Sequence, residues 1–175
     1  MKNFKLAFLF LATVGMISCG DKKEGNEEMK LESPSTSTKS IQSEETTSSD
    51  EKMVELTITG NDQMQFNKNE LKVKAGQKVK LTLTHVGKMD INVMGHNWVL
   101  LKKGSDISEF GNAAASAKDN DYIPVGTDAV IVHTKMIGGG ESVTIEFDAP
   151  EAGTYDFICS FPGHYALMKG KFIVE

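Results

Sequence analysis

The ten residues CSFPGHYALM, from Cys159 to Met168, bring a thiol, an imidazole and a thioether together near the end of the chain. Soft sulfur ligands combined with imidazole favour copper. A trigonal set of two histidines and one cysteine, with a distant methionine, is the blue-copper geometry. Pro162 and Gly163 are typical turn residues, so the chain can reverse between Cys159 and His164. This stretch therefore predicts a loop that wraps one metal ion.

The second histidine of such a site is expected from the segment Met94-Gly95-His96-Asn97-Trp98. His96 shares strand parity with Trp98, a candidate core residue, so its ring should point inward. Gly95 has no side chain, which would let its carbonyl approach a metal closely. Asn97 could donate a hydrogen bond to the sulfur of Cys159. Each residue taken alone is more simply a core residue, but the combination predicts a metal centre.

Outward from these motifs, the chain after residue 51 alternates between apolar and polar residues. Such alternation predicts half-buried antiparallel strands, bounded here by clusters of glycine, asparagine and aspartate. The apolar positions include Val79, Leu81, Leu83, Val143, Ile145, Phe147, Tyr155, Phe157, Phe172 and Val174. Seven or eight short strands in a domain of this length indicate an all-β sandwich.

One stretch of the domain, residues 105–119, departs from the strand pattern. Asp106 stands three residues before Glu109, and an alanine-rich run follows. This combination predicts a short helix inserted between two strands.

The N-terminal 18 residues have the composition of a signal peptide. Lys2 and Lys5 precede an apolar run from Leu6 to Ile17, which is too short to span a bilayer comfortably. The run ends in Ser18 and Cys19, which resembles the bacterial lipoprotein box. We therefore expect Cys19 to carry a lipid; an ordinary signal peptide followed by an incidental cysteine is the alternative.

The next segment, residues 19–50, is rich in serine, threonine, glutamate and lysine. This composition cannot bury enough apolar surface to offset the entropy of ordering, so it predicts a disordered linker. Residues 51–175 remain as the folded domain.

Charge and cysteine content narrow the possible functions. The formal net charge is −5, and all 19 basic residues are lysine, so no nucleic acid partner is expected. The chain has only two cysteines, in very different contexts, which argues against a disulfide framework.

Four segments resemble azurin, of the cupredoxin family of type 1 blue-copper proteins. They are residues 60–67, residues 92–100, His133-Thr134-Lys135 with Ile137 and Gly138, and residues 161–170. The resemblance implies an eight-stranded Greek-key, cupredoxin-like β-sandwich with a short helical insertion. It also implies one type 1 copper ion held by His96, Cys159 and His164, with Met168 and the carbonyl of Gly95 as weak axial ligands. Asn97 and the backbone amide of Phe161 are the implied donors to the Cys159 sulfur.

The same resemblance implies an apolar docking patch around a solvent-exposed edge of His164. Its expected members are Met64, Met89, Met94, Phe161, Pro162, Ala166 and Leu167. An exposed apolar patch of this kind marks an interaction surface. We therefore expect redox proteins, such as cytochromes or terminal reductases and oxidases, to dock there. With a lipid at Cys19, the protein would work in the cell envelope, in the periplasm or at the cell surface.

These features predict an electron carrier that cycles between Cu(I) and Cu(II), rather than an enzyme. A copper buffer or chaperone is the main alternative, but such proteins usually hold copper in shallow, exchangeable sites. A multicopper enzyme would need further copper sites, for which four histidines are too few. We interpret His85 as a partly buried strand residue and His133 as a surface or strand-end residue.

Overall fold

The computed structural model of the protein describes residues 53–175. The predicted signal peptide, the linker and the predicted lipid site at Cys19 lie outside the described residues. Within the described part, no helix has the length and apolar character needed to cross a membrane.

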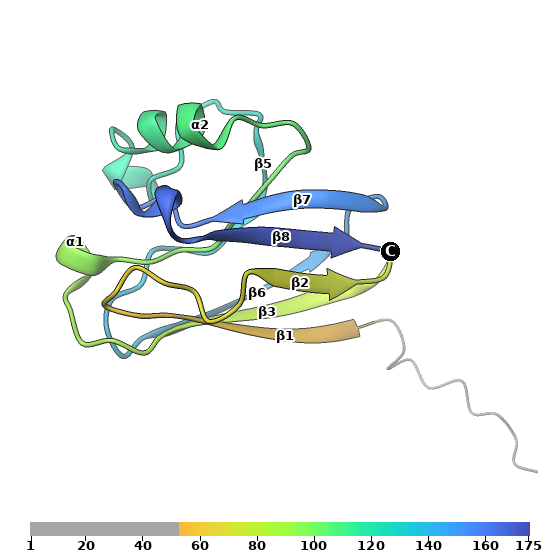
Figure 1. Ribbon diagram of the computed structural model, residues 1–175, viewed down its shortest axis with the longest axis horizontal. Helices are drawn as coiled ribbons and strands as arrows, with labels where there is room; N and C mark the ends of the chain where they lie inside the picture. The colour runs from red at the N-terminus through yellow and green to blue at the C-terminus, as the bar shows by residue number, and fades with distance from the viewer. Residues whose placement is uncertain (1–52) are drawn as a thin grey trace, which may run out of the picture. The chain divides into compact units, whose positions relative to one another are not determined.

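The described chain folds into eight strands in two sheets, seen as two layers in Figure 1. The first sheet has the order β1-β3-β6, formed by Met53–Gly60, Lys78–His85 and Ser142–Asp148. The second has the order β2-β8-β7-β4-β5, formed by Glu70–Val73, Lys169–Val174, Gly153–Ile158, Val99–Leu101 and Val130–His133. The prediction of an eight-stranded sandwich with a helical insertion is confirmed.

The expectation that all strands pair antiparallel is wrong for two pairs. β1 runs parallel to β3, and β2 runs parallel to β8. After β1 the chain crosses to β2 in the other sheet and then returns to β3, so β3 can lie beside β1 in the same direction. Alternation along a strand shows which face is buried, but not the direction of its neighbour.

The core between the two sheets is apolar and aromatic. Trp98 is fully buried, and its ring lies 5.7 Å from that of Phe157 and 6.0 Å from that of Phe172. Leu81 and Leu83 of β3 are also fully buried, as their alternation predicts. Burial of Trp98 in this core also restrains the position of His96, the second candidate histidine, which lies two residues earlier in the chain.

A second buried cluster lies beneath the helical insertion. Helix α2 spans Ile107–Ala114, and the side chain of Asp106 accepts hydrogen bonds from the backbone N–H groups of Ser108 and Glu109 at 2.8 and 2.9 Å. The helix is shorter than the predicted stretch 105–119, and a separate 3-10 turn, η2, follows at Lys118–Asn120. The buried face of α2 packs into a cluster that includes Cys159 and Met168.

Two short helical segments complete the fold. Helix α1 spans Ile91–Met94 and the 3-10 turn η3 spans His164–Ala166. Both lie at the end of the sandwich opposite the C terminus (Figure 1). The two sequence motifs with candidate metal ligands therefore meet at one end of the fold.

Candidate metal centre

Three candidate ligands meet at this end of the sandwich. The donor atoms of His96, Cys159 and His164 lie within 4.8 Å of one another, and all three residues are buried. The sulfur of Cys159 lies 3.9 Å from Nδ1 of His96 and 3.6 Å from Nδ1 of His164. These three residues come from the segment before β4 and from the loop after β7, as the two motifs predict.

The ring of His96 is held so that Nδ1 faces the sulfur. Its Nε2–H donates to the carbonyl of Asn61 at 2.9 Å, which leaves the Nδ1 lone pair free for a metal. The backbone is fixed as well, because His96 and Ile137 exchange two hydrogen bonds of 2.9 Å. A Cβ atom on Gly60 would lie 2.6 Å from Cδ2 of His96, so glycine is required there for the ring to pack against the backbone.

Asn61 was not predicted to take part in the site. Its contribution is a backbone carbonyl, and a carbonyl leaves no signature in the sequence. Its side chain shapes the same turn, because Oδ1 accepts hydrogen bonds from the backbone of Gln63 at 3.0 Å and of Gln65 at 3.1 Å.

His164 lies at the start of η3, directly after the Pro162-Gly163 turn. Gly163 has φ 81°, a left-handed conformation that suits glycine, so the turn forms as predicted. Burial lowers the pKa of His164 to about 4, and the nearby rings of His96 and His85 add to this effect. Burial likewise lowers the pKa of His96, against the opposing hydrogen bond to Asn61. Both rings are therefore neutral at pH 7, the state that binds a metal.

Cys159 is fully buried. Burial raises the pKa of its thiol to about 12, although hydrogen bonds from the backbone amides of Asn97 and Phe161 oppose the rise. The same two amides would stabilise a metal-bound thiolate. The thiol must lose its proton when a metal binds.

Asn97 donates a hydrogen bond to the Cys159 sulfur, as expected, but not through its side chain. Its backbone, not its side chain, donates to the sulfur of Cys159. The side-chain amide instead joins the two ligand segments: Oδ1 accepts from the backbone N–H of Ser160 at 2.8 Å, and Nδ2 donates to the Ser160 hydroxyl at 2.8 Å. Both residues are completely buried, so this bridge is shielded from water.

The two candidate axial groups belong to residues that contact the three donor residues. Met168 is fully buried, and its backbone is held by hydrogen bonds with Cys159 and His164 at 2.9 and 2.7 Å. The carbonyl oxygen of Gly95 lies 3.9 Å from the Cys159 sulfur. A Cβ on Gly95 would lie 2.5 Å from the carbonyl of Ile91 and 3.0 Å from the side chain of Met136, so glycine is needed here too.

His85 lies directly behind His96. The two rings stack with their centroids 4.2 Å apart and their planes 17° from parallel. Nε2 of His85 donates to the carbonyl of Met94 at 2.8 Å, and Nδ1 accepts from the backbone of Gly87 at 3.0 Å. The sequence predicted a partly buried residue, but His85 is completely buried and forms part of the wall of the site.

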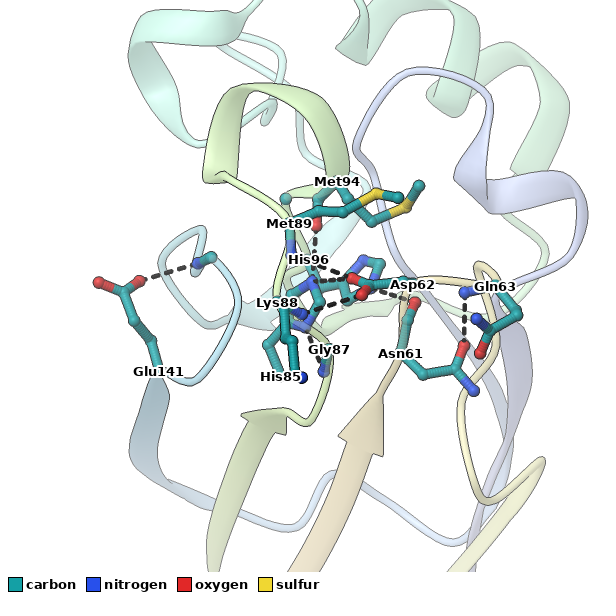
Figure 2. A network of polar contacts seen from close by, with 12 residues as sticks. Asn61, Asp62, Gln63, His85, Gly87, Lys88, Met89, Met94, His96 and Glu141 are labelled. Atoms are coloured by element: carbon teal, nitrogen blue, oxygen red, sulfur yellow. Dashed lines mark hydrogen bonds and ion pairs between the residues drawn. The ribbon is translucent and has the colours of Figure 1, made fainter.

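The carboxylate of Asp62 holds the loop that follows His85. It accepts hydrogen bonds from the backbone of Lys88 at 2.9 Å and of Met89 at 3.3 Å, and the first of these is the main cause of its lowered pKa. Figure 2 shows Asp62 facing this loop, with Met89 and Met94 above it. Asp62 therefore positions a loop that carries one of the expected patch residues.

The expected docking patch is only partly exposed. Leu167 is 63% exposed and Met89 43%, and Pro162 and Ala166 are also exposed. Met64 and Met94 are half-buried, whereas Phe161 is buried against His164, with ring centroids 4.6 Å apart. The expectation of a solvent-exposed His164 edge needs correction, because only 2% of this residue is exposed. Any partner would meet the surrounding apolar side chains first.

His133 does not join the centre. It is the last residue of β5 and is half-buried, and its Nδ1 lies 3.0 Å from the carbonyl of Thr134. This agrees with the interpretation of a strand-end residue.

The donor set fits one first-row metal ion. Ligand bonds of about 2.0 Å to nitrogen and about 2.3 Å to sulfur, at about 120°, place the two donor atoms about 3.7 Å apart. The observed separations of 3.6 and 3.9 Å agree with this value. Two imidazoles, one thiolate and a nearby thioether favour copper over harder metals. The fold and the site thus define a copper-binding β-sandwich protein.

Comparison with known proteins agrees with this class. The family model described as copper binding proteins, plastocyanin/azurin family, matches residues 52–175. Azurin-1 from Alcaligenes xylosoxydans xylosoxydans is 45% identical over 117 residues, covering 65% of this chain and 91% of that protein. Azurin from Pseudomonas aeruginosa is 45% identical over 122 residues, covering 67% of this chain and 82% of that protein.

Solved structures give the same result. Auracyanin A, a "blue" copper protein from the green thermophilic photosynthetic bacterium Chloroflexus aurantiacus, is 36% identical with a TM-score of 0.65. The alignment covers 70% of this chain and 99% of that chain. The chain therefore belongs to the plastocyanin/azurin family of copper-binding proteins, and copper is the cofactor of its metal centre.

Proposed function

We propose that this blue-copper protein carries single electrons between redox proteins that dock at the apolar patch beside His164. The observation that carries the proposal is the buried cluster of His96, Cys159 and His164, next to exposed apolar side chains at the same end of the fold. Bound copper supplies a one-electron couple between Cu(I) and Cu(II).

Hydrogen bonds from the surrounding residues restrain the candidate ligands. His96 is fixed by the carbonyl of Asn61 and by the bridge to Ile137, and Cys159 receives two backbone hydrogen bonds. The Asn97 amide ties the two ligand segments together. Ligands held this firmly need little rearrangement when the charge of the site changes, which suits rapid electron transfer.

Burial also explains why this arrangement suits a carrier better than a buffer or chaperone. All three donor residues are buried, so an incoming copper acceptor could not reach them without opening the loop from Cys159 to Met168. An electron needs no such opening, because it can leave through His164, of which 2% is exposed at the protein surface.

The docking surface consists of Leu167 and Met89, flanked by Pro162, Ala166 and the half-buried Met64 and Met94. Apolar contact excludes water between two redox centres and dissociates quickly when the buried area is small. A lipid on Cys19, with residues 19–50 as a tether, would hold the domain near a membrane of the cell envelope while it meets its partners.

A charge placed on the docking surface should slow electron transfer without changing the copper site. We expect Leu167→Glu and Met89→Lys to slow electron self-exchange between two copies by at least about tenfold, roughly 1.4 kcal/mol of activation free energy. Like charges brought together at a desolvated contact account for this effect. The rate is measured by NMR line broadening in mixed Cu(I) and Cu(II) samples.

Met53→Lys is a matched control for Met89→Lys. The two methionines are 41% and 43% exposed, but Met53 begins β1 at the opposite end of the sandwich. The control should keep the wild-type rate. Equal rates in all variants, with unchanged blue spectra, would show that electrons leave through another surface.

A further inference from the structure

Two consecutive residues beside the metal centre have an unfavourable backbone conformation. Among the described residues, positive φ outside glycine occurs only at Met64, Asp121 and Tyr122, with φ 51° for Asp121 and 57° for Tyr122. The left-handed conformation is disfavoured for residues with a Cβ, and most of all for large ones such as tyrosine. Such a pair persists only where its surroundings hold it, which is a reason to ask what it contacts.

The carbonyl of Asp121 holds the amide that links the two ligand segments. It accepts a hydrogen bond of 2.8 Å from Nδ2 of Asn97, whose second N–H donates to Ser160. Asn97 follows His96, and Ser160 follows Cys159. With Oδ1 accepting from the Ser160 backbone, the amide uses both of its N–H groups and its oxygen. Asp121 therefore fixes the orientation of the bridge between two copper ligands.

The carboxylate of Asp121 makes a second contact near the site. Oδ1 accepts a hydrogen bond of 2.8 Å from the backbone N–H of Met136. The side chain of Met136 packs against Gly95, since a Cβ on that glycine would lie 3.0 Å from its Cγ and Sδ. Gly95 carries the candidate axial carbonyl. The position of this carbonyl thus depends on Met136, and the position of Met136 depends on Asp121.

Tyr122 extends the same support to the third ligand. Its buried ring packs edge-on against Phe161 with centroids 5.2 Å apart, and Phe161 packs against His164. The left-handed pair directs the Asp121 carboxylate toward Met136 and the Tyr122 ring toward Phe161. One short segment after η2 therefore contacts neighbours of all three candidate ligands.

We propose that Asp121 is a positioning residue for the copper centre: its carbonyl orients Asn97 and its carboxylate anchors Met136, so that the Gly95 carbonyl keeps its place 3.9 Å from the Cys159 sulfur. This inference rests on the proposed function, because it concerns the same site. Without the anchor, the Gly95 carbonyl would be free to approach a copper ion held by the three donor residues. A hard carbonyl oxygen stabilises Cu(II) more than Cu(I), so loss of the anchor favours the oxidised state.

A simpler role is that Asp121 only ends η2, where a left-handed residue is common. Two variants separate these roles. Asp121→Gly adopts the left-handed conformation freely and keeps the carbonyl, but it removes the acceptor for Met136. Asp121→Asn also tolerates that conformation and keeps an oxygen acceptor. Both variants remove the negative charge, so the charge does not account for a difference between them.

The first measurement is the reduction potential of the copper-loaded full chain. We expect Asp121→Gly to favour Cu(II) by at least threefold relative to Asp121→Asn, a potential lower by about 28 mV, because tenfold is 59 mV for a one-electron couple. Asp121→Asn should lie closer to wild type than to Asp121→Gly. Equal potentials for the two variants would overturn the proposal.

The second measurement is amide hydrogen exchange in the copper-free protein, which does not depend on the redox function. In Asp121→Gly, the Met136 amide should exchange at least tenfold faster relative to the core amide of Leu81. Equal acceleration of both amides would indicate general destabilisation and would also overturn the proposal. A wild-type protein that binds copper without blue colour would contradict the proposed function, and the exchange comparison would still test the anchor.

Discussion

The copper-free protein should lose stability as the pH falls from about 6.5 to about 4, because His164 must be neutral in the folded state. Burial holds the pKa of His164 at about 4, against 6.5 for an ordinary histidine. Between these values the unfolded chain binds the proton and the folded chain does not. The free energy of unfolding therefore decreases as the pH is lowered through this window, and the full loss is reached below about pH 4.

The size of the effect follows from the width of the window. Each pH unit corresponds to about 1.4 kcal/mol, so His164 accounts for a loss of up to about 3 kcal/mol. His96 adds to the loss, because burial lowers its pKa as well. The lowered pKa values of Asp62 and Asp90 act below their ordinary value of 3.8, outside this window.

Chemical denaturation of the copper-free protein at pH 7 and pH 4 measures this loss. The His164→Gln variant has no titratable ring at this position. Its free energy of unfolding should therefore change less than that of wild type between the two pH values, with a difference of up to about 3 kcal/mol. The NMR titration of the His164 ring gives the same information without a variant. A midpoint near 6.5, together with an unchanged pH dependence in His164→Gln, would refute the assignment of a buried, neutral ring.

Three further predictions concern the thiol, the helix contact and the N-terminus. Anaerobic binding of Cu(I) at pH 7 should release about one proton, because the pKa of the Cys159 thiol is about 12. A pH indicator measures the released proton, and no release would mean that the thiol is already ionised. Gly111→Ala should destabilise the copper-free protein by about 1–3 kcal/mol in denaturant titrations, because its Cβ would lie 2.2 Å from the Tyr165 ring. Stability within about 0.5 kcal/mol of wild type would show that the ring moves aside at little cost. Cys19→Ala should move the protein from the membrane fraction to the soluble fraction; unchanged fractionation would contradict the lipid anchor.

The sequence predicts the strands and the metal ligands well, for physical reasons. Leu81 and Leu83 alternate with polar neighbours, and burial of one strand face leaves this pattern in any half-buried sheet. The cluster of His96, Cys159 and His164 can be predicted because a thiol and two imidazoles, with a thioether following the second imidazole, form a donor set that copper prefers. The N-terminus of α2 can be predicted because Asp106 caps it through its side chain.

Features that depend on backbone groups or on chain direction could not be predicted. The parallel pairing of β1 with β3 follows from the path through β2, which alternation does not encode. The carbonyls of Asn61 and Asp121 hold His96 and Asn97, yet every residue has a carbonyl. The near-complete burial of His164 depends on how Phe161 and its neighbours close over the ring, which only the folded chain reveals.

The visible absorption spectrum of the copper-loaded protein tests the central claim most directly. Wild type should be intensely blue, because charge transfer from the Cys159 thiolate to Cu(II) absorbs in the visible region. Cys159→Ser should remain folded, since serine fits the buried position, but it should be colourless. A wild-type protein that binds Cu(II) without this colour, or a Cys159→Ser variant that stays blue, would contradict the assignment of a blue-copper centre.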